Sequence, residues 1–266
     1  MHFLFPSDPI DPRQTDSTFR EQADEIRKLG MGVSIVALEE LGQEPCRLRG
    51  PIPADAMVVY RGWMVTPTEY EELVKLIHSH GAIPLISPEK YVLCHYLPNW
   101  YPLISEFTPE TRVFPANADL AKELRTLNWK KFFIKDFAKS LKTSIGSVIA
   151  DPNDITVVVS EMQKFRGSIE GGVCVRQFED FVPNSEKRYF VIGGRPHAAL
   201  GTPPTLAFEC AQRVHSPFFS IDIARNTNGI DRVVEIGDGQ VSDLVGWDAL
   251  GFAQLWKDEP LSGRLN

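Results

Sequence analysis

The sequence predicts an α/β front domain with a parallel sheet, followed by an α+β rear. Residues 1–88 alternate short apolar runs with helical patterns, and this alternation favours a parallel sheet covered by helices. Beyond residue 178 the pattern becomes rich in hairpins, with turn signals at Gly193-Gly194 and Asn228-Gly229. A chain of 266 residues allows one large or two modest domains. We therefore expect domains at residues 1–88 and 89–266.

The front domain has the periodicity of strands alternating with helices. We expect its strands at residues 2–5, 33–38, 57–60 and 83–86, and its helices at 17–29 and 68–80. In the second helix Tyr70, Leu73 and Ile77 fall on one face, and Gly81 follows as a stop signal. The order of these elements predicts a Rossmann-like fold.

The rear begins with an irregular, aromatic segment at residues 91–114 and then regains regular patterns. Its expected helices are residues 119–127, 154–165 and 244–256. Its expected strands are residues 132–137, 147–150, 173–178, 189–192 and 196–199. This mixture predicts an α+β arrangement.

Composition excludes several classes of function. The net charge of −7 argues against a nucleic-acid-binding protein, which would normally be basic. No apolar run approaches the ~20 residues that a membrane helix needs, and no signal peptide opens the sequence. The four cysteines form no CxxC pair, which predicts reduced, mostly buried thiols and a cytoplasmic location. The oligomeric state stays open.

The segment FSIDIARNTNGIDRVVEIGDG carries the strongest chemical signal. If Asn228-Gly229 forms a two-residue type I′ turn, Thr227 pairs with Ile230 and Asp222 lies opposite Glu235. The strand period of two then places both carboxylates on one face.

Two facing carboxylates would repel each other by about 4 kcal/mol at ~4 Å and an effective dielectric of ~20. A divalent cation between them, or protonation of one carboxylate, removes this cost, and Mg²⁺ takes carboxylate oxygens while leaving room for phosphate. The alternative is a solvated hairpin whose charges splay apart, aided by Arg225 and Arg232.

Phosphate binding cannot use the common motifs, because the sequence has no GxxxxGK[ST] and no GxGxxG. Lys135 instead ends an apolar strand, where a desolvated ammonium favours an anion as partner. A polar loop with Lys139, Lys142 and Ser144 follows. The alternative for Lys135 is an edge-strand lysine that pairs with Asp136 or another acid.

These segments, taken in order, resemble the ATP-grasp superfamily and are most similar to its R-two-K clade. The resemblance rests on FFIKDF, TSIGS, VRQFEDF, EKRYFVIGG, and IDIA followed by VVEIGDG, and it covers residues 90–245. It implies an ATP-grasp domain at residues 89–266 after a pre-ATP-grasp front domain. The central lobe would be residues 115–172 and the C-terminal lobe residues 173–266.

The resemblance also implies roles for individual residues. Lys135 and Arg188 would be the catalytic cations, and Lys142 and Ser144 would lie in a lid over the phosphates. The hinge VRQFEDF would bind adenine, and Glu186 would bind ribose. The metal ligands would be Asp222 and Glu235. The complete nucleotide set is Lys135, Lys142, Ser144, Gln177, Glu179, Phe181 and Glu186.

One position departs from the pattern of the superfamily, which often has Asn two residues after the final glutamate. Here that position is Gly237. Asp238 or Gln240 would have to supply the missing oxygen ligand, and we expect Asp238 to join the metal site.

The resemblance implies an ATP- and Mg²⁺-dependent ligase. It would activate a small-molecule or peptide carboxylate as an acyl phosphate for attack by an amine-type acceptor. Arg61 and Trp63 follow a predicted strand, the usual place for ligands in an open α/β sheet, so we expect them at the substrate. Ordinary turn chemistry is the alternative for both. Two other functions stay open: a small-molecule kinase, and a non-catalytic nucleotide-binding protein.

Overall fold

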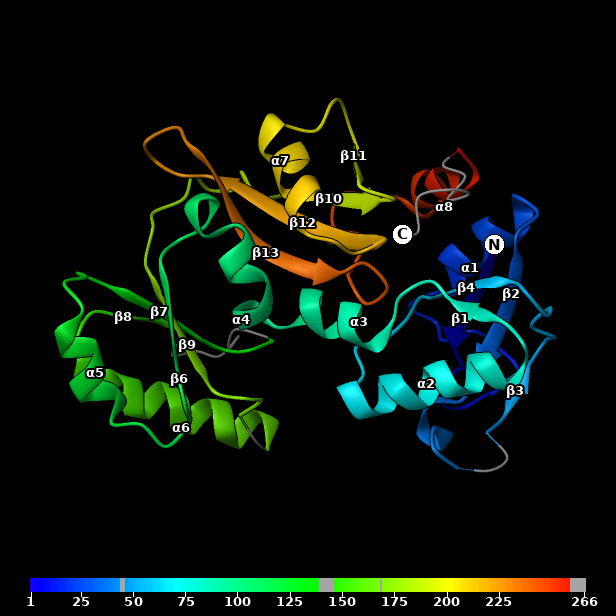
Figure 1. Ribbon diagram of the computed structural model, residues 1–266, viewed down its shortest axis with the longest axis horizontal. Coiled ribbons are helices and arrows are strands. Elements are labelled where there is room, and N and C mark those ends of the chain that lie inside the picture. The colour runs from blue at the N-terminus through cyan, green and yellow to red at the C-terminus, as the bar shows by residue number, and fades with distance from the viewer. Residues whose placement is uncertain (44–45, 139–145, 168, 259–266) are drawn as a thin grey trace. The chain divides into compact units, whose positions relative to one another are not determined.

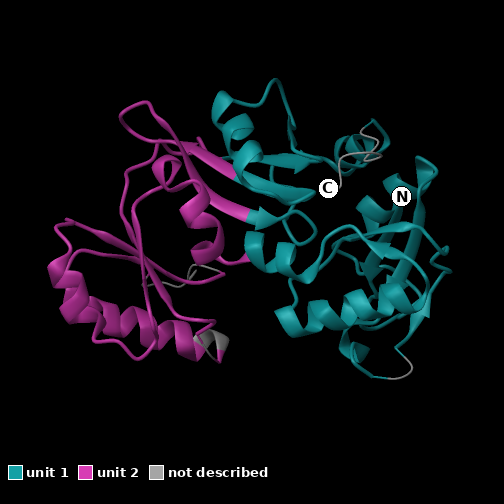
Figure 2. Cartoon of the chain, viewed as in Figure 1, with its two compact units in different colours: residues 1–94, 187–221, 237–266 teal, residues 95–186, 222–236 magenta. Residues whose placement is uncertain are grey.

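The computed structural model describes residues 1–43, 46–138, 146–167 and 169–258. The chain divides into two compact units, shown in Figure 2. Unit 1 contains residues 1–94, 187–221 and the chain from 237 onward, and unit 2 contains residues 95–186 and 222–236. The division after residue 94 lies within helix α3 (Pro88–His95), which begins at the predicted boundary. The predicted C-terminal lobe is divided between the units, because its residues 173–186 and 222–236 belong to unit 2 and the others to unit 1.

Unit 1 contains a five-stranded sheet of order β3-β2-β1-β4-β5. The strands are β1 (His2–Pro6), β2 (Gly32–Val36), β3 (Leu48–Arg49), β4 (Met57–Tyr60) and β5 (Ile83–Pro84). All pairings are parallel except that of β2 with β3. The predicted Rossmann-like front is therefore confirmed, with one short edge strand that the sequence did not indicate.

Three helices bury the apolar faces of the front sheet: α1 (Arg20–Lys28), α2 (Pro67–Ser79) and α8 (Ala249–Asp258). Helix α2 begins with a capping box in which Thr66 and Glu69 exchange bonds, and Pro67 occupies its first turn. It ends before Gly81, which has a φ of 70°. Helix α8 supplies Trp256, whose ring meets that of Phe3 at 5.4 Å.

Unit 2 contains an antiparallel sheet of order β6-β9-β7-β8, with helices α5 (Leu120–Thr126) and α6 (Ile155–Arg166) packed on it (Figure 1). Its strands are β6 (Thr111–Phe114), β7 (Phe132–Asp136), β8 (Val148–Ile149) and β9 (Val173–Gln177). Phe132 and Ile134 of β7 are buried in the core with the two helices. Because strand side chains alternate, Lys135 points to the opposite face.

Short helical turns complete both units. In unit 2 they are α4 (Leu97–Trp100) and the 3₁₀ turns Tyr101–Leu103, Ser105–Phe107 and Pro152–Asp154, while unit 1 has a further 3₁₀ turn at Leu38–Glu40. Trp100 is almost completely buried. The segment 91–114, predicted to be irregular, therefore also contains regular structure, namely the end of α3 and strand β6, besides these turns.

The third sheet has the order β11-β10-β12-β13 and is built from two hairpins. Its elements are β10 (Lys187–Ile192), β11 (Arg195–Ala198), helix α7 (Thr205–Arg213), β12 (Phe218–Arg225) and β13 (Asp231–Asp238). Gly193 and Gly194 have φ of 57° and 79°, and Ile192 pairs with Arg195 around them. The predicted two-residue turn is confirmed at this hairpin.

In the described part of the chain, no helix is both long enough and apolar enough to cross a membrane.

Candidate functional site

Lys135 lies on the face of the unit 2 sheet that is turned away from α5 and α6. Its strand, β7, lies between β9 and β8, so Lys135 is not on an edge strand, but it does pair with an acid, as the alternative also held. The residue is only 4% exposed. Its Nζ lies 3.2 Å from Oε1 of Glu235 and donates a hydrogen bond to it. A buried ammonium therefore contacts Glu235, one of the three predicted metal ligands.

Asp222 and Glu235 occupy neighbouring strands, β12 and β13. Asp222 is 4% exposed, whereas the Glu235 side chain is 43% exposed. Glu235 therefore offers a carboxylate that is accessible to solvent and touches a buried cation.

The turn of this hairpin differs from the prediction. Asn226 N–H donates to the Ile230 carbonyl at 2.8 Å, and Gly229 N–H donates to the Asn226 carbonyl at 2.9 Å. Among the described non-glycine residues only Asp55 and Asn184 have positive φ, whereas Gly229 has a φ of 81°. The predicted type I′ turn at Asn228-Gly229 is wrong, because the loop has three residues with glycine in the left-handed position.

The register of the hairpin changes along its length. Near the turn Asn226 lies opposite Ile230, whereas at the other end Gly239 N–H donates to the Phe218 carbonyl at 3.4 Å. The chain from Ile230 to Gly239 is one residue longer than that from Asn226 to Phe218. One extra residue in β13 accounts for this difference.

The position of the extra residue follows from burial along β13. Val233 and Ile236 are both buried, although residues three apart on a regular strand point to opposite faces. The alternation therefore breaks at Val234 and Glu235. In the register near the turn, Asp222 lies opposite Val234. In the register at the other end, which is shifted by the extra residue, Asp222 lies opposite Glu235. That the two carboxylates face each other remains a prediction.

Arg176 on β9 is a functional candidate that the sequence interpretation did not single out. Its guanidinium is buried, with Nη1 donating to the Val234 carbonyl at 2.6 Å and Nη2 donating to Thr108 Oγ1. Burial lowers the pKa of Arg176 to about 10, although the nearby carboxylate of Glu235 acts in the opposite direction. The sequence signal was a charged residue directly after the apolar run VCV of this strand.

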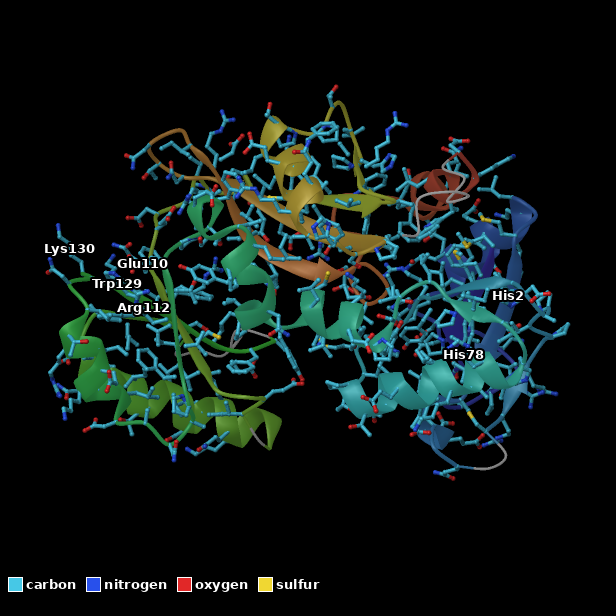
Figure 3. All side chains as sticks on the ribbon, in the orientation of Figure 1. His2, His78, Glu110, Arg112, Trp129 and Lys130 are labelled. Atoms are coloured by element: carbon cyan, nitrogen blue, oxygen red, sulfur yellow. The ribbon has the colours of Figure 1, made fainter. Side chains whose placement is uncertain are left out.

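The predicted hinge lies beside a cavity of about 400 Å³ in unit 2. The cavity is lined by Phe178, Glu179, Asp180, Asn226, Thr227, Asn228, Ile230 and Arg232. Glu179 forms an ion pair with Arg232 at 2.8 Å, which fixes the wall of the cavity. Gln177 N–H donates to the carbonyl of Glu110, a residue labelled in Figure 3. Among the described bonds, none uses the backbone N–H of Glu179 or Phe181.

Arg61 is not placed as a substrate-binding residue would be. It is 1% exposed, its Nη1 donates to the carbonyls of Gly239 and Gln240, and its Nε donates to Gln22. Its guanidinium also lies 4.9 Å from the centre of the Phe252 ring. Burial lowers the pKa of Arg61 to about 10. The structure therefore gives Arg61 a packing role inside unit 1.

We expect Arg61→Met to lower the free energy of unfolding by about 3 kcal/mol, because buried hydrogen bonds to charged groups contribute ~1.5–3 kcal/mol each. Denaturant unfolding of the unliganded protein measures this loss. Trp63→Phe, which loses the bond from Nε1 to Asp16 and part of a half-exposed ring that packs on Phe19, is the milder comparison. An Arg61→Met protein with unchanged stability would contradict the packing role.

Asp238 and Gln240 are also turned into unit 1. Asp238 is 0% exposed, and its Oδ1 accepts bonds from the backbone N–H and the Nε2 of Gln240. Gln240 is 1% exposed and also bonds Tyr70 and the N–H of Tyr60. The expectation that either residue supplies a metal ligand is therefore not supported by their surroundings.

Gly237 has a structural reason to differ from the asparagine of the family pattern. A Cβ at this position would lie 2.9 Å from the hydroxyls of both Ser220 and Ser242. Those two hydroxyls bond each other at 2.8 Å. An asparagine would have to displace this serine pair.

The remaining predicted residues are distributed over both units. Arg188 on β10 donates to the Asp243 carbonyl at 2.9 Å, and Glu186 is exposed. Trp63 is 47% exposed and its Nε1 donates to Asp16. Lys142 and Ser144, together with Lys139, lie outside the described residues.

Magnesium is compatible with the residues present. In the described ranges no three His, Cys, Asp or Glu side chains form a group that could hold a metal ion. Mg²⁺ does not need such a cage, because it commonly binds one or two carboxylates together with phosphate oxygens and water. Asp222 and Glu235 fit that donor set.

Known structures with the same fold cover the entire chain. D-cycloserine synthetase DcsG is 13% identical, with a TM-score of 0.64 and 100% coverage of both chains. The D-alanine-D-alanine ligase from Coxiella burnetii is 14% identical, with a TM-score of 0.64, and 100% of this chain and 95% of that chain are covered. The ATP-grasp ligase PsnB, solved with a minimal precursor, Mg and ADP, is 11% identical, with a TM-score of 0.60 and coverage of 96% and 97%. The fold is that of the ATP-grasp enzymes.

A comparison of the sequence with family models shows the family to which the chain belongs. The model of the ATP-grasp domain of the R-two-K clade, family 3, matches residues 126–258, which is half of the chain. The protein belongs to this family, and ATP binding is intrinsic to its fold. No curated protein matches the chain by sequence.

Proposed function

We propose that the chain is an ATP- and Mg²⁺-dependent ligase that joins a carboxylate to an amine or a similar nucleophile. The observation that carries the proposal is the buried Lys135 in contact with Glu235, one strand away from the buried Asp222. A desolvated ammonium and two carboxylates are suited to a metal-bound polyphosphate.

The proposed nucleotide position follows the hairpin. The adenine end lies at the hinge cavity, where the N–H groups of Glu179 and Phe181 supply donors, and Glu186 binds the ribose. Arg232 at the cavity and Glu235 at Lys135 are three residues apart, about 10 Å along a strand. That separation suits a base at one end and phosphates at the other. Lys142 and Ser144 complete the proposed phosphate contacts.

In the proposed reaction a carboxylate oxygen of the substrate attacks the γ-phosphorus of ATP, and the bond to the bridging oxygen breaks to release ADP. The amine then attacks the acyl carbon, loses a proton, and displaces phosphate. Mg²⁺, when bound, neutralises phosphate charge. Lys135 and Arg188 would orient the phosphates and stabilise the charge that moves to them. The substrate is a small molecule or a peptide, with Trp63 as the remaining candidate contact. Cysteines kept as thiols would suit a cytoplasmic location.

We expect Mg-ATP to raise the melting temperature. A ligand at about one hundred times its dissociation constant adds ~2.7 kcal/mol of stability, and calorimetry with Mg-ATP, Mg-ADP and ATP in EDTA measures it. The shift should be larger with Mg²⁺ than in EDTA. If neither nucleotide changes the melting temperature at millimolar concentration, the nucleotide site is absent.

Analysis of the products separates a ligase from a kinase, since ADP forms in both cases. A conjugate of carboxylate and amine supports the ligase, and a stable phosphorylated substrate identifies a kinase.

A further inference from the structure

Two side chains of unit 2 bind successive carbonyl groups of β13, directly before Glu235. Thr108 Oγ1 donates to the Val233 carbonyl at 2.7 Å, and Arg176 Nη1 donates to the Val234 carbonyl at 2.6 Å. Arg176 Nη2 also donates to Thr108 Oγ1, so the two side chains form one unit. We refer to Thr108 and Arg176 as the carbonyl clamp.

A regular strand could not present its backbone in this way, because successive carbonyls point in opposite directions. The carbonyl clamp therefore binds β13 where its geometry is irregular. The same place was identified above from the hairpin register and from the burial of both Val233 and Ile236. An extra residue of this kind re-aims a side chain, and such bulges are common beside active sites.

The carbonyl clamp is buried at some energetic cost. Thr108 is 1% exposed and Arg176 is 5% exposed. The Nε of Arg176 has no hydrogen-bond partner among the described residues, and its guanidinium lies 6.0 Å from the ring of Trp100. A buried guanidinium is retained only where its hydrogen bonds offset its desolvation. Here the hydrogen bonds of the clamp fix the backbone of the two residues before Glu235.

Arg176 of the carbonyl clamp and Lys135 lie on the same face of the unit 2 sheet. Lys135 pairs with Cys174, and Arg176 is two residues further along β9, so Lys135 and Arg176 share a face. Glu235 reaches Lys135 on that face. We propose that Thr108 and Arg176 are positioning residues that fix the β13 bulge and thereby aim Glu235 at the metal. The inference depends on the proposed function.

Thr108→Val tests the proposal, because it keeps the shape of the side chain and removes its hydroxyl. We expect ATP affinity in EDTA to stay within twofold, and the gain in affinity on adding Mg²⁺ to fall about tenfold, since residues that orient metal ligands contribute ~10–100-fold. Thr108→Ser keeps the hydroxyl and should retain most of the gain. Isothermal titration calorimetry of ATP with and without Mg²⁺ measures both affinities.

Thr111→Val is the matched control. Thr111 is 3% exposed on the neighbouring β6, and its hydroxyl donates to the Pro109 carbonyl. This variant should leave the Mg²⁺-dependent gain unchanged. Arg176→Lys, which keeps the charge but not the forked geometry, should repeat the loss if Thr108→Val does not fold.

A double-mutant cycle with Glu235→Gln separates positioning from general damage. If the clamp acts through Glu235, Thr108→Val should have no further effect on the Mg²⁺-dependent gain in the Glu235→Gln background. Additive losses, or an unchanged gain in both Thr108→Val and Arg176→Lys, would overturn the inference. Absence of any Mg²⁺-dependent gain in the unmodified protein would instead count against the proposed function.

Discussion

Glu235→Gln is expected to reduce ADP formation by on the order of 100-fold or more while the protein stays folded. A metal ion that this carboxylate holds would stabilise transition-state charge by several kcal/mol, and ~2.7 kcal/mol corresponds to 100-fold in rate. Glutamine keeps the size of the side chain, and its carbonyl oxygen can still accept the bond from Lys135. Mg²⁺ affinity should fall together with the rate. Steady-state ADP release at several Mg²⁺ concentrations measures both effects.

Asp231→Asn is the control for this prediction. It removes a carboxylate from the same strand, where Asp231 forms an ion pair at 2.8 Å with the mostly exposed Arg225. Exposed pairs contribute little, so the rate should not change. Equal turnover in Glu235→Gln and Asp231→Asn would remove the basis for a metal at Glu235.

The front sheet could be predicted because its signals are local. Short stretches of sequence are enough to predict its elements. Examples are the apolar run Met57–Tyr60 for a strand and the capping residues Thr66 and Glu69 for the start of a helix. Strand β3 was missed because two residues, Leu48 and Arg49, carry no period. Helix α7 was missed because it follows a proline pair and buries a face as small as Ala207, Cys210 and Ala211.

The two hairpins show where a turn rule fails. At Gly193-Gly194 both residues adopt positive φ, as a type I′ turn requires. At Asn228-Gly229 the side chain of Asn226 intervenes, since its Oδ1 accepts bonds from the N–H groups of Asn228 and Ile230. This cap stabilises a three-residue loop. The competing signal was present in the sequence, two positions before the dipeptide used for the prediction.

Asp238 and Arg61 were assigned to the site from their positions in the sequence, which do not tell where a side chain points. Asp238 is three residues beyond Glu235 and its carboxyl is enclosed in unit 1. Arg61 follows a strand, as a ligand-binding residue would, yet it binds the backbone carbonyls of Gly239 and Gln240. Both outcomes depend on contacts between segments far apart in the chain. Lys135 was found because a lysine within an apolar strand is unusual in itself.

Asp238→Asn is expected to make the protein more stable at pH 8 and to leave its stability nearly unchanged at pH 4. Complete burial raises the pKa of Asp238 from 3.8 to about 7, against smaller opposing effects from its bonds with Gln240 and from the charge of Arg61. The folded state therefore holds this proton while the unfolded state releases it. Stability due to the protonated carboxyl is fully present below pH 3.8, and it is lost as the pH rises toward about 7.

The size of the effect follows from the shift. A difference of about three pKa units corresponds to at most ~4 kcal/mol, because each unit is 1.36 kcal/mol. Asparagine resembles the protonated acid, since its carbonyl oxygen can accept from Gln240 while it carries no charge. The free energy of unfolding of the variant, relative to that of the unmodified protein, should therefore increase from pH 4 to pH 8. Denaturant unfolding of both unliganded proteins across this range measures the gain. A constant difference in stability at all pH values would mean that Asp238 is already ionised in the fold at low pH, and that a counter-charge or water reaches the Oδ2 atom for which the described residues supply no hydrogen-bond partner.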